Sequence, residues 1–271
     1  MNRDALNALD QAVAIARERA GDRPPIVGVA GPQGSGKTTL VSAYAAAHPG
    51  TAHFSLDDFY VGRKRREGWA RDGHPLLATR GPPPTHDTAA LLHTIDRLER
   101  ANPGEHITWP AFDKLADDIL PETKWPTFAG RPNLILIDGW CLGATPQSEA
   151  ALIVPVNALE SEMDADGHWR RLVNRHLGAE YATFFARLDA ILCLRAPSFD
   201  IVHAWRCEQE EGLLGRALTD AERARIARFI QHYERITRHM MSGGRRADIE
   251  VQLDERRNVT EIKSNPRAQD T

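Results

Sequence analysis

The sequence predicts an α/β fold in which helices cover both faces of a parallel sheet. Short apolar segments typical of buried strands alternate along the chain with longer segments of helical periodicity. This alternation is the pattern of parallel strands joined by helical crossovers. A glycine-rich segment at residues 31–39 joins the first apolar segment directly to a helix. No linker divides the chain, so we expect one domain spanning residues 1–271.

Apolar runs bounded by turn residues predict the strands, at 25–30, 51–56, 133–139, 190–195 and 247–253. Residues 133–139 carry the strongest strand signal, whereas 247–253 alternate polar and apolar residues and are expected nearer an edge of the sheet. Helical periodicity predicts the helices, at 4–20, 40–47, 86–100, 164–188, 198–214 and 219–241. We expect Thr85 to cap the helix at 86–100.

The segments 58–85 and 109–132 show neither pattern. Long irregular segments in a compact domain usually carry function, so we expect both to be loops or lids of a binding site. The polar residues 254–271 are expected to form a mobile tail.

Composition favours a cytoplasmic protein. The net charge is −3 and the pI about 6.4, which provides no basic field for nucleic acid. No apolar run approaches the ~20 residues that span a bilayer, and the N-terminal residues lack an apolar signal region. The three cysteines, Cys141, Cys193 and Cys207, show no metal-ligand spacing and are expected to be free thiols. We therefore expect neither nucleic acid nor a membrane as a partner, and the sequence leaves the oligomeric state open.

Residues Gly31–Thr39 match G-x-x-x-x-G-K-[ST], the loop that cradles phosphates in nucleoside triphosphatases. Its glycines let backbone amides approach a polyphosphate such as that of ATP, at the N-terminus of a helix. Lys37 can reach the outer phosphates, and Thr38 can place its hydroxyl on Mg²⁺. The residues expected to bind the nucleotide are Gly31, Gln33, Gly34, Ser35, Gly36, Lys37, Thr38 and Thr39.

Carboxylates follow two of the predicted strands. Asp57 and Asp58 follow the strand at 51–56, and Asp138 ends the strand at 133–139. If both strands lie beside the first, these carboxylates meet the phosphate loop at one edge of the sheet. Phosphoryl transfer needs a carboxylate near Mg²⁺, expected to be Asp138, and an acceptor for the substrate's hydroxyl proton, Asp57 or Asp58. The alternatives are a solvated turn pair for Asp57 and Asp58 and an ordinary turn acid for Asp138.

The segment Ser55–Tyr60 resembles the strand-end motif of the phosphoribulokinase and uridine kinase group. The chain resembles the D-glycerate 3-kinase family more closely still. The segments that carry this resemblance are Gly31–Thr39, Ser55–Tyr60, Arg80-Gly81, Thr85–Asp87, Pro110–Lys114, Asp138–Gly143, Pro155–Glu160, Leu194–Phe199 and Trp205–Glu210. The resemblance implies a P-loop nucleoside triphosphatase fold and ATP-dependent phosphorylation of a small hydroxy acid. It also places Asp57, rather than Asp58, at the position of the base.

A hydroxy acid needs cations for its carboxylate and partners for its hydroxyls. The residues expected to bind it are Arg80, His86, Asp87 and Lys114, from the two irregular segments. Lys114 is the strongest candidate, because an ammonium near Asp113 keeps its charge. His86 has an alternative role as a hydrogen-bonding residue at the start of a helix.

The basic run Arg63–Arg66 and the single residue Arg206 are each open to two interpretations. The run Arg63–Arg66 is either a solvated loop face or a lid over the phosphate. In kinases similar to this chain, an arginine from the segment holding Arg206 reaches the transferred phosphate. The alternative for Arg206 is a surface ion pair with Glu210, one helical turn away.

These observations predict a kinase that transfers the γ-phosphate of ATP to a small hydroxy acid, with D-glycerate to 3-phosphoglycerate as the leading reaction. One alternative is a P-loop kinase for another small alcohol, such as a nucleoside or pantothenate. A second alternative is a regulatory protein that binds ATP without phosphorylating a small molecule. The long segment 58–85 after the acidic strand end favours a kinase, because a regulator needs no acceptor pocket.

Overall fold

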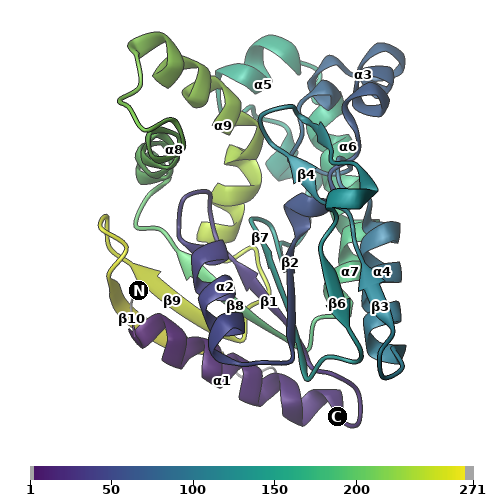
Figure 1. The fold of residues 1–271 in the computed structure, drawn as a ribbon. Coiled ribbons are helices and arrows are strands. Elements are labelled where there is room, and N and C mark those ends of the chain that lie inside the picture. Colours follow the sequence, from purple (N-terminus) through teal and green to yellow (C-terminus); the bar gives the residue numbers. More distant parts are fainter. Residues whose placement is uncertain (1–2, 266–271) are drawn as a thin grey trace.

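A central sheet organises the computed structural model, which describes residues 3–265 (Figure 1). The strand order is β10-β9-β8-β1-β7-β2. Every neighbouring pair is parallel except β9 and β10, which are antiparallel. The strands are β1 (Ile26–Ala30), β2 (Thr51–Ser55), β7 (Leu134–Gly139), β8 (Ala190–Arg195), β9 (Ile249–Leu253) and β10 (Val259–Ser264). The predicted α/β fold with a mostly parallel sheet is confirmed.

Helices cover both faces of this sheet, as the continuous burial of its central strands requires (Figure 1). One face packs against α1 (Arg3–Ala20), α2 (Lys37–Ala47) and part of α8 (Phe199–Leu214). The other face packs against α4 (Thr88–Arg100), α6 (His168–His176) and α7 (Ala182–Ala186), and α9 (Asp220–Met241) contributes to both cores. Within β1, Val27 and Val29 lie in the first core and Ile26 in the second, as the two-residue period of a strand dictates.

The segment 58–85 is more ordered than expected. It contains α3 (Arg63–Asp72) and a short 3-10 turn at Pro75–Ala78, so the prediction of an irregular loop is wrong over these residues. The buried guanidinium of Arg66 stabilises this region by donating to the carbonyl oxygens of Val61 at 2.9 Å and Ala78 at 2.5 Å. The interpretation of Arg63–Arg66 as a solvated loop face therefore fails at Arg66, although Arg63 is exposed and pairs with Glu67.

The helix after this segment begins later than predicted. Asp87 is the N-cap of α4, and its carboxylate accepts a hydrogen bond from the Ala90 amide at 2.9 Å. Thr85 is not the cap, because its hydroxyl is engaged within the preceding turn, where it accepts from the Gly81 amide and donates to the Pro82 carbonyl.

Short antiparallel pairs shape the second irregular segment. Strands β3 (His106–Thr108) and β6 (Thr127–Ala129) pair with each other, and β4 (Phe112–Asp113) pairs with β5 (Asp118–Ile119). The β4–β5 hairpin extends over the carboxyl end of the main sheet, close to α3 (Figure 1).

The C-terminal residues differ from the expected tail. Residues 259–264 form β10, which places β9 one strand in from the edge of the sheet. Residues 266–271 of the expected mobile tail lie outside the described residues. A short helix, α5 (Ala158–Met163), precedes α6. Between residues 3 and 265, no helix combines the length and apolar character needed to cross a membrane. Cys141, Cys193 and Cys207 are all buried free thiols.

Candidate active site

The phosphate loop connects β1 to α2, as its sequence motif predicts. Gly36 occupies the N-cap position of α2 with a left-handed φ of 91°, and no side chain caps the helix amides. Gly34 also has a positive φ, and a Cβ atom there would lie 2.7 Å from the Cβ of Trp205 on α8. Gln33 Oε1 and Ser35 Oγ are buried with no hydrogen-bond partner among the described residues. The loop thus presents uncapped helix amides and the unpaired Ser35 hydroxyl, which are donors that fit an anionic ligand.

Lys37 is the first residue of α2 and only 9% exposed. Its ammonium donates to the carbonyl of Pro32 at 2.9 Å, which holds it beneath the loop. Burial lowers the pKa of Lys37, while the negative charges of Asp138 and Asp57 act to raise it. Lys37 thus provides a buried positive charge at the loop, which is the charge that a bound phosphate needs.

Asp138 lies at the end of β7, next to the phosphate loop. The Thr38 hydroxyl donates to its carboxylate at 3.0 Å, and the Ser55 hydroxyl does so at 3.3 Å. Burial raises the pKa of Asp138 and the charge of Lys37 opposes this effect. The condition that both acidic strands lie beside β1 is not met, because β7 separates β1 from β2. The convergence still occurs because β7 borders both strands, and Asp138 is in register with Ser55 and Val29.

Asp57 and Asp58 lie in a 3-10 turn, Leu56–Phe59, that follows β2. The Asp58 carboxylate accepts the Ser55 amide at 2.8 Å and closes a capping box with the Ser55 side chain. Burial raises the pKa of Asp58 to about 6. The side chain of Asp58 is therefore committed to the turn, and the two acids are not a solvated pair.

Asp57 instead meets groups from distant segments. Its carboxylate accepts from the Lys114 ammonium at 2.7 Å and the Tyr60 hydroxyl at 2.9 Å, and it lies 4.0 Å from His86 Nε2. Burial acts to raise the pKa of Asp57, but the charge of Lys114 and the hydrogen bonds from Lys114 and Tyr60 hold it well below its usual value. Asp57 is therefore ionised at neutral pH.

Two of the four predicted acceptor residues, Arg80 and Lys114, line the same cleft as the phosphate loop. The partner of Lys114 is Asp57, and not Asp113 as expected. The Asp113 carboxylate accepts the amides of Leu115 and Ala116 and shapes the tip of the β4–β5 hairpin. The Asp57 charge raises the pKa of Lys114, so this ammonium keeps its charge for a different reason than the sequence suggested.

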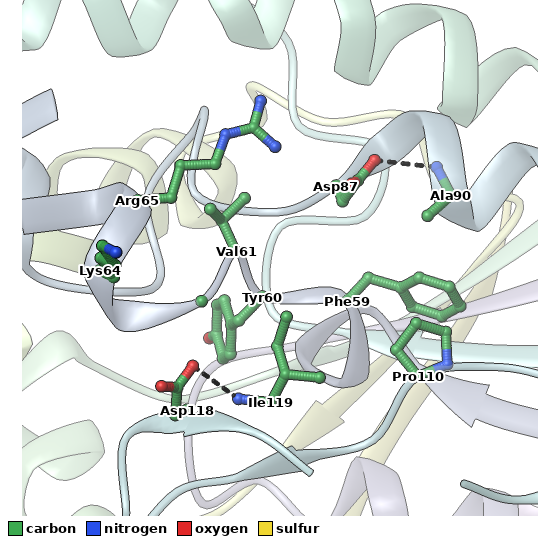
Figure 2. A pocket seen from close by; sticks show the side chains of 11 residues that line it. Phe59, Tyr60, Val61, Lys64, Arg65, Asp87, Ala90, Pro110, Asp118 and Ile119 are labelled. Carbon is green, nitrogen blue, oxygen red and sulfur yellow. Dashed lines mark hydrogen bonds between the residues drawn. The ribbon is translucent and has the colours of Figure 1, made fainter. Parts of the chain in front are cut away.

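His86 and Asp87, the other two predicted acceptor residues, do not line this cleft. His86 is buried behind Asp57, stacks on Tyr60 with ring centroids 4.5 Å apart, and its Nδ1 lies 2.5 Å from the Tyr181 hydroxyl. Burial lowers the pKa of His86 to about 4, so the ring is neutral at pH 7. Figure 2 shows Asp87 at a second hollow of about 580 Å³, where its carboxylate points to Ala90. The structure thus gives Asp87 a capping role outside the cleft.

The main cleft has a volume of about 840 Å³. Its walls come from the phosphate loop, the ends of β2 and β7, the β4–β5 hairpin, α8, α9 and the turn between β9 and β10. The volume suits a nucleotide together with a small acceptor. Arg206 lines this cleft from α8 and forms the expected ion pair with Glu210 at 2.7 Å, and its approach to the transferred phosphate stays a prediction.

Tyr60 and Arg257 are site residues that the sequence did not single out. Tyr60 lies three residues after Asp57, and this spacing could have indicated that its hydroxyl reaches the Asp57 carboxylate. Arg257 carried no such signal: it donates to the Gly34 carbonyl at 2.7 Å and lies over the Trp205 ring at 4.9 Å, from the opposite end of the chain. These contacts hold the phosphate loop between α8 and the β9–β10 turn.

Comparisons with known proteins agree with this geometry. No family model matches the chain. It is 29% identical over 223 residues to an uncharacterized kinase, mug58, of Schizosaccharomyces pombe, covering 78% of this chain and 79% of that one. It is 30% identical over 204 residues to the chloroplastic D-glycerate 3-kinase of Arabidopsis thaliana, covering 70% of this chain and 42% of that one.

Among solved structures, the fold matches a D-glycerate 3-kinase from Cryptococcus neoformans var. grubii with a TM-score of 0.74. Identity is 22%, and the match covers 97% of this chain and 98% of that one. This likeness extends over the sheet, the helices that cover it and the segments around the cleft. The chain therefore has the fold of P-loop kinases and is similar over most of its length to proteins named as kinases, D-glycerate 3-kinases among them.

Proposed function

We propose that this protein transfers the γ-phosphate of ATP to a hydroxyl of D-glycerate and forms 3-phosphoglycerate. The observation that carries the proposal is the Asp57–Lys114 contact of 2.7 Å, in the cleft that also holds the phosphate loop. It places a carboxylate for a hydroxyl proton and a cation for a substrate carboxylate side by side. The relatives that are D-glycerate 3-kinases by name support the choice of acceptor.

In the proposed mechanism, the loop amides and Lys37 hold the polyphosphate, and Asp57 orients the acceptor hydroxyl. The hydroxyl oxygen forms a bond to the γ-phosphorus as the bond to the β,γ-bridging oxygen breaks. Asp57 accepts the hydroxyl proton late in this step, because its low pKa makes it a weak base. Asp58 is the less suitable base, since its carboxylate already accepts the Ser55 amide. Arg206, from α8, is proposed to approach the transferred phosphate.

Mg²⁺ fits the oxygen donors beside the loop. Thr38 and Asp138, whose side chains are 3.0 Å apart, would hold it, and it would neutralise phosphate charge when bound. Within the described residues, no group of three or more His, Cys, Asp or Glu side chains could hold a metal alone. Protein sites usually bind Mg²⁺ through one or two carboxylates together with substrate phosphates and water.

The cations of the cleft favour an acid over a neutral acceptor. Arg80 and Lys114 come from different segments and both border the space next to Asp57. Nucleosides and pantothenate remain the alternative acceptors, and a regulatory ATP-binding protein would leave these two cations without a substrate. A cytoplasmic location stays a prediction, since the A. thaliana relative is chloroplastic by name.

The proposal is tested by measuring ATP consumption with D-glycerate, L-glycerate, uridine and pantothenate, with each product identified directly. We expect D-glycerate to be phosphorylated most efficiently. Turnover of uridine or pantothenate with none of D-glycerate would remove the acid substrate and leave the ATP site intact.

Replacing Lys114 with methionine should raise the KM for D-glycerate by about tenfold or more and leave the KM for ATP nearly unchanged. The ammonium is a contact to the acceptor side of the cleft, and methionine keeps much of its length. Loss of this cation also raises the pKa of Asp57, so the acid limb of the pH–rate profile should move to higher pH. Steady-state kinetics over a pH series measures both effects.

The matched control is Lys64→Met, an exposed lysine on α3 outside the cleft, which should change neither constant. A Lys114→Met protein with an unchanged acceptor KM and an unmoved acid limb would contradict the assignment.

A further inference from the structure

Asp117, at the turn of the β4–β5 hairpin, contacts two arginines at once. Its Oδ2 lies 3.0 Å from Arg66, and its Oδ1 accepts a hydrogen bond from Arg80. Its backbone has a left-handed φ of 56°, which is uncommon for a residue other than glycine. A carboxylate held in this way links α3, the hairpin and the segment before Gly81.

Arg66 is the more firmly held of the two arginines that contact Asp117. Its side chain is 1% exposed, and its donors reach the carbonyls of Val61, Ala78 and Asp117 as well as the Asp117 carboxylate. These contacts use four of its five N–H donors, and the side chain is buried away from solvent. Arg66 therefore anchors Asp117 from inside the protein.

Arg80 is the arginine with hydrogen-bond donors still available to a ligand. Its guanidinium lies between the rings of Phe112 at 5.6 Å and Phe229 at 5.9 Å, which confine it sideways. It uses one N–H on the Asp117 carboxylate and one on the Lys114 carbonyl at 3.2 Å. A guanidinium has five N–H donors, so three remain for another partner. Arg80 lines the main cleft, whereas Asp117 does not.

We propose that Asp117 is a positioning residue that fixes the Arg80 guanidinium toward the anionic group of the acceptor. This inference rests on the proposed function in taking the acceptor to be an acid. Arginine binds a carboxylate best when its planar group is held in place beforehand, because less conformational freedom is then lost on binding. Asp117 sets that position without touching the substrate, and so it governs the affinity for the acid and not the chemical step.

The test replaces Asp117 with asparagine, which tolerates a left-handed backbone and keeps one oxygen acceptor. We expect the KM for D-glycerate to rise about tenfold, with kcat and the KM for ATP changed by less than about twofold. The matched control is Asp118→Asn, the next residue, whose carboxylate accepts the Arg63 amide at 3.1 Å on an exposed side of the hairpin. This control should change each constant by less than about twofold.

A double-mutant cycle with Arg80→Met shows whether Asp117 acts through Arg80. In the Arg80→Met background, Asp117→Asn should add no further rise in the acceptor KM. Additive effects of the two substitutions would overturn the inference. So would a lower KM in Asp117→Asn, which would mean that Asp117 competes with the substrate for Arg80. A fall in kcat with unchanged KM would assign Asp117 a structural role only.

Calorimetric binding of D-glycerate to the inactive Lys37→Ala protein separates this inference from the proposed function. If the Lys37→Ala protein does not bind D-glycerate and the unmodified enzyme does not phosphorylate it, the proposed function fails. If the acid binds with the same affinity whether residue 117 is Asp or Asn, the role of Asp117 fails and the proposed function stands.

Discussion

Replacing Lys37 with alanine should lower kcat/KM for the kinase reaction by about a hundredfold or more, which corresponds to roughly 2.7 kcal/mol of transition-state stabilisation. The ammonium is buried beneath the phosphate loop, where it donates to the Pro32 carbonyl and interacts with both Asp138 and Asp57. The fold should survive, since burial of this charge already opposes its ionised form. Steady-state kinetics and thermal unfolding of the variant measure the two properties separately.

Lys64→Ala serves as the control for the Lys37 variant, because Lys64 is an exposed lysine on α3 outside the main cleft. Near-normal turnover by a folded Lys37→Ala protein would contradict the assignment of the phosphate loop as the site of transfer.

Replacing Asp57 with asparagine should abolish most transfer while ATP binding is retained. The amide keeps the size of the side chain but cannot accept the hydroxyl proton, and general-base catalysis typically contributes 10²–10⁴-fold, so a loss of about a hundredfold or more in kcat is expected. The ammonium of Lys114 also loses its charged partner, 2.7 Å away. ATP affinity by calorimetry and kcat with D-glycerate are the two measurements.

Asp58→Asn is the matched control, one residue along the same turn. An asparagine can still accept the Ser55 amide through its side-chain oxygen, and it removes a carboxylate whose ionised form is disfavoured by burial. The pKa of Asp58, raised to about 6, makes its charged form costly to the folded state as pH rises from about 4 through 6, so this variant should not be less stable at pH 7. Should Asp58→Asn abolish transfer while Asp57→Asn does not, the roles of the two acids are reversed.

Local sequence patterns predicted much of the fold. The apolar runs at 133–139 and 190–195 became β7 and β8 with nearly the predicted bounds, because a strand buried on both faces must be apolar throughout. One error lies where a helix is stabilised by a residue on a distant segment. Helix α3 has few apolar residues, and it is stabilised by the buried Arg66, whose partners include Asp117 on another segment.

The sequence by itself determined the fold class, the phosphate loop and the placing of Asp57 and Asp138 at strand ends. These features depend on spacing within short segments, where periodicity and turn chemistry act directly. Only the tertiary structure decided two of the contacts: Lys114 with Asp57 rather than with Asp113, and Arg257 with the phosphate loop. Such contacts join residues far apart in the chain. They follow from the order of strands in the sheet and from the packing of the hairpin and helices over its carboxyl end, which no local pattern encodes.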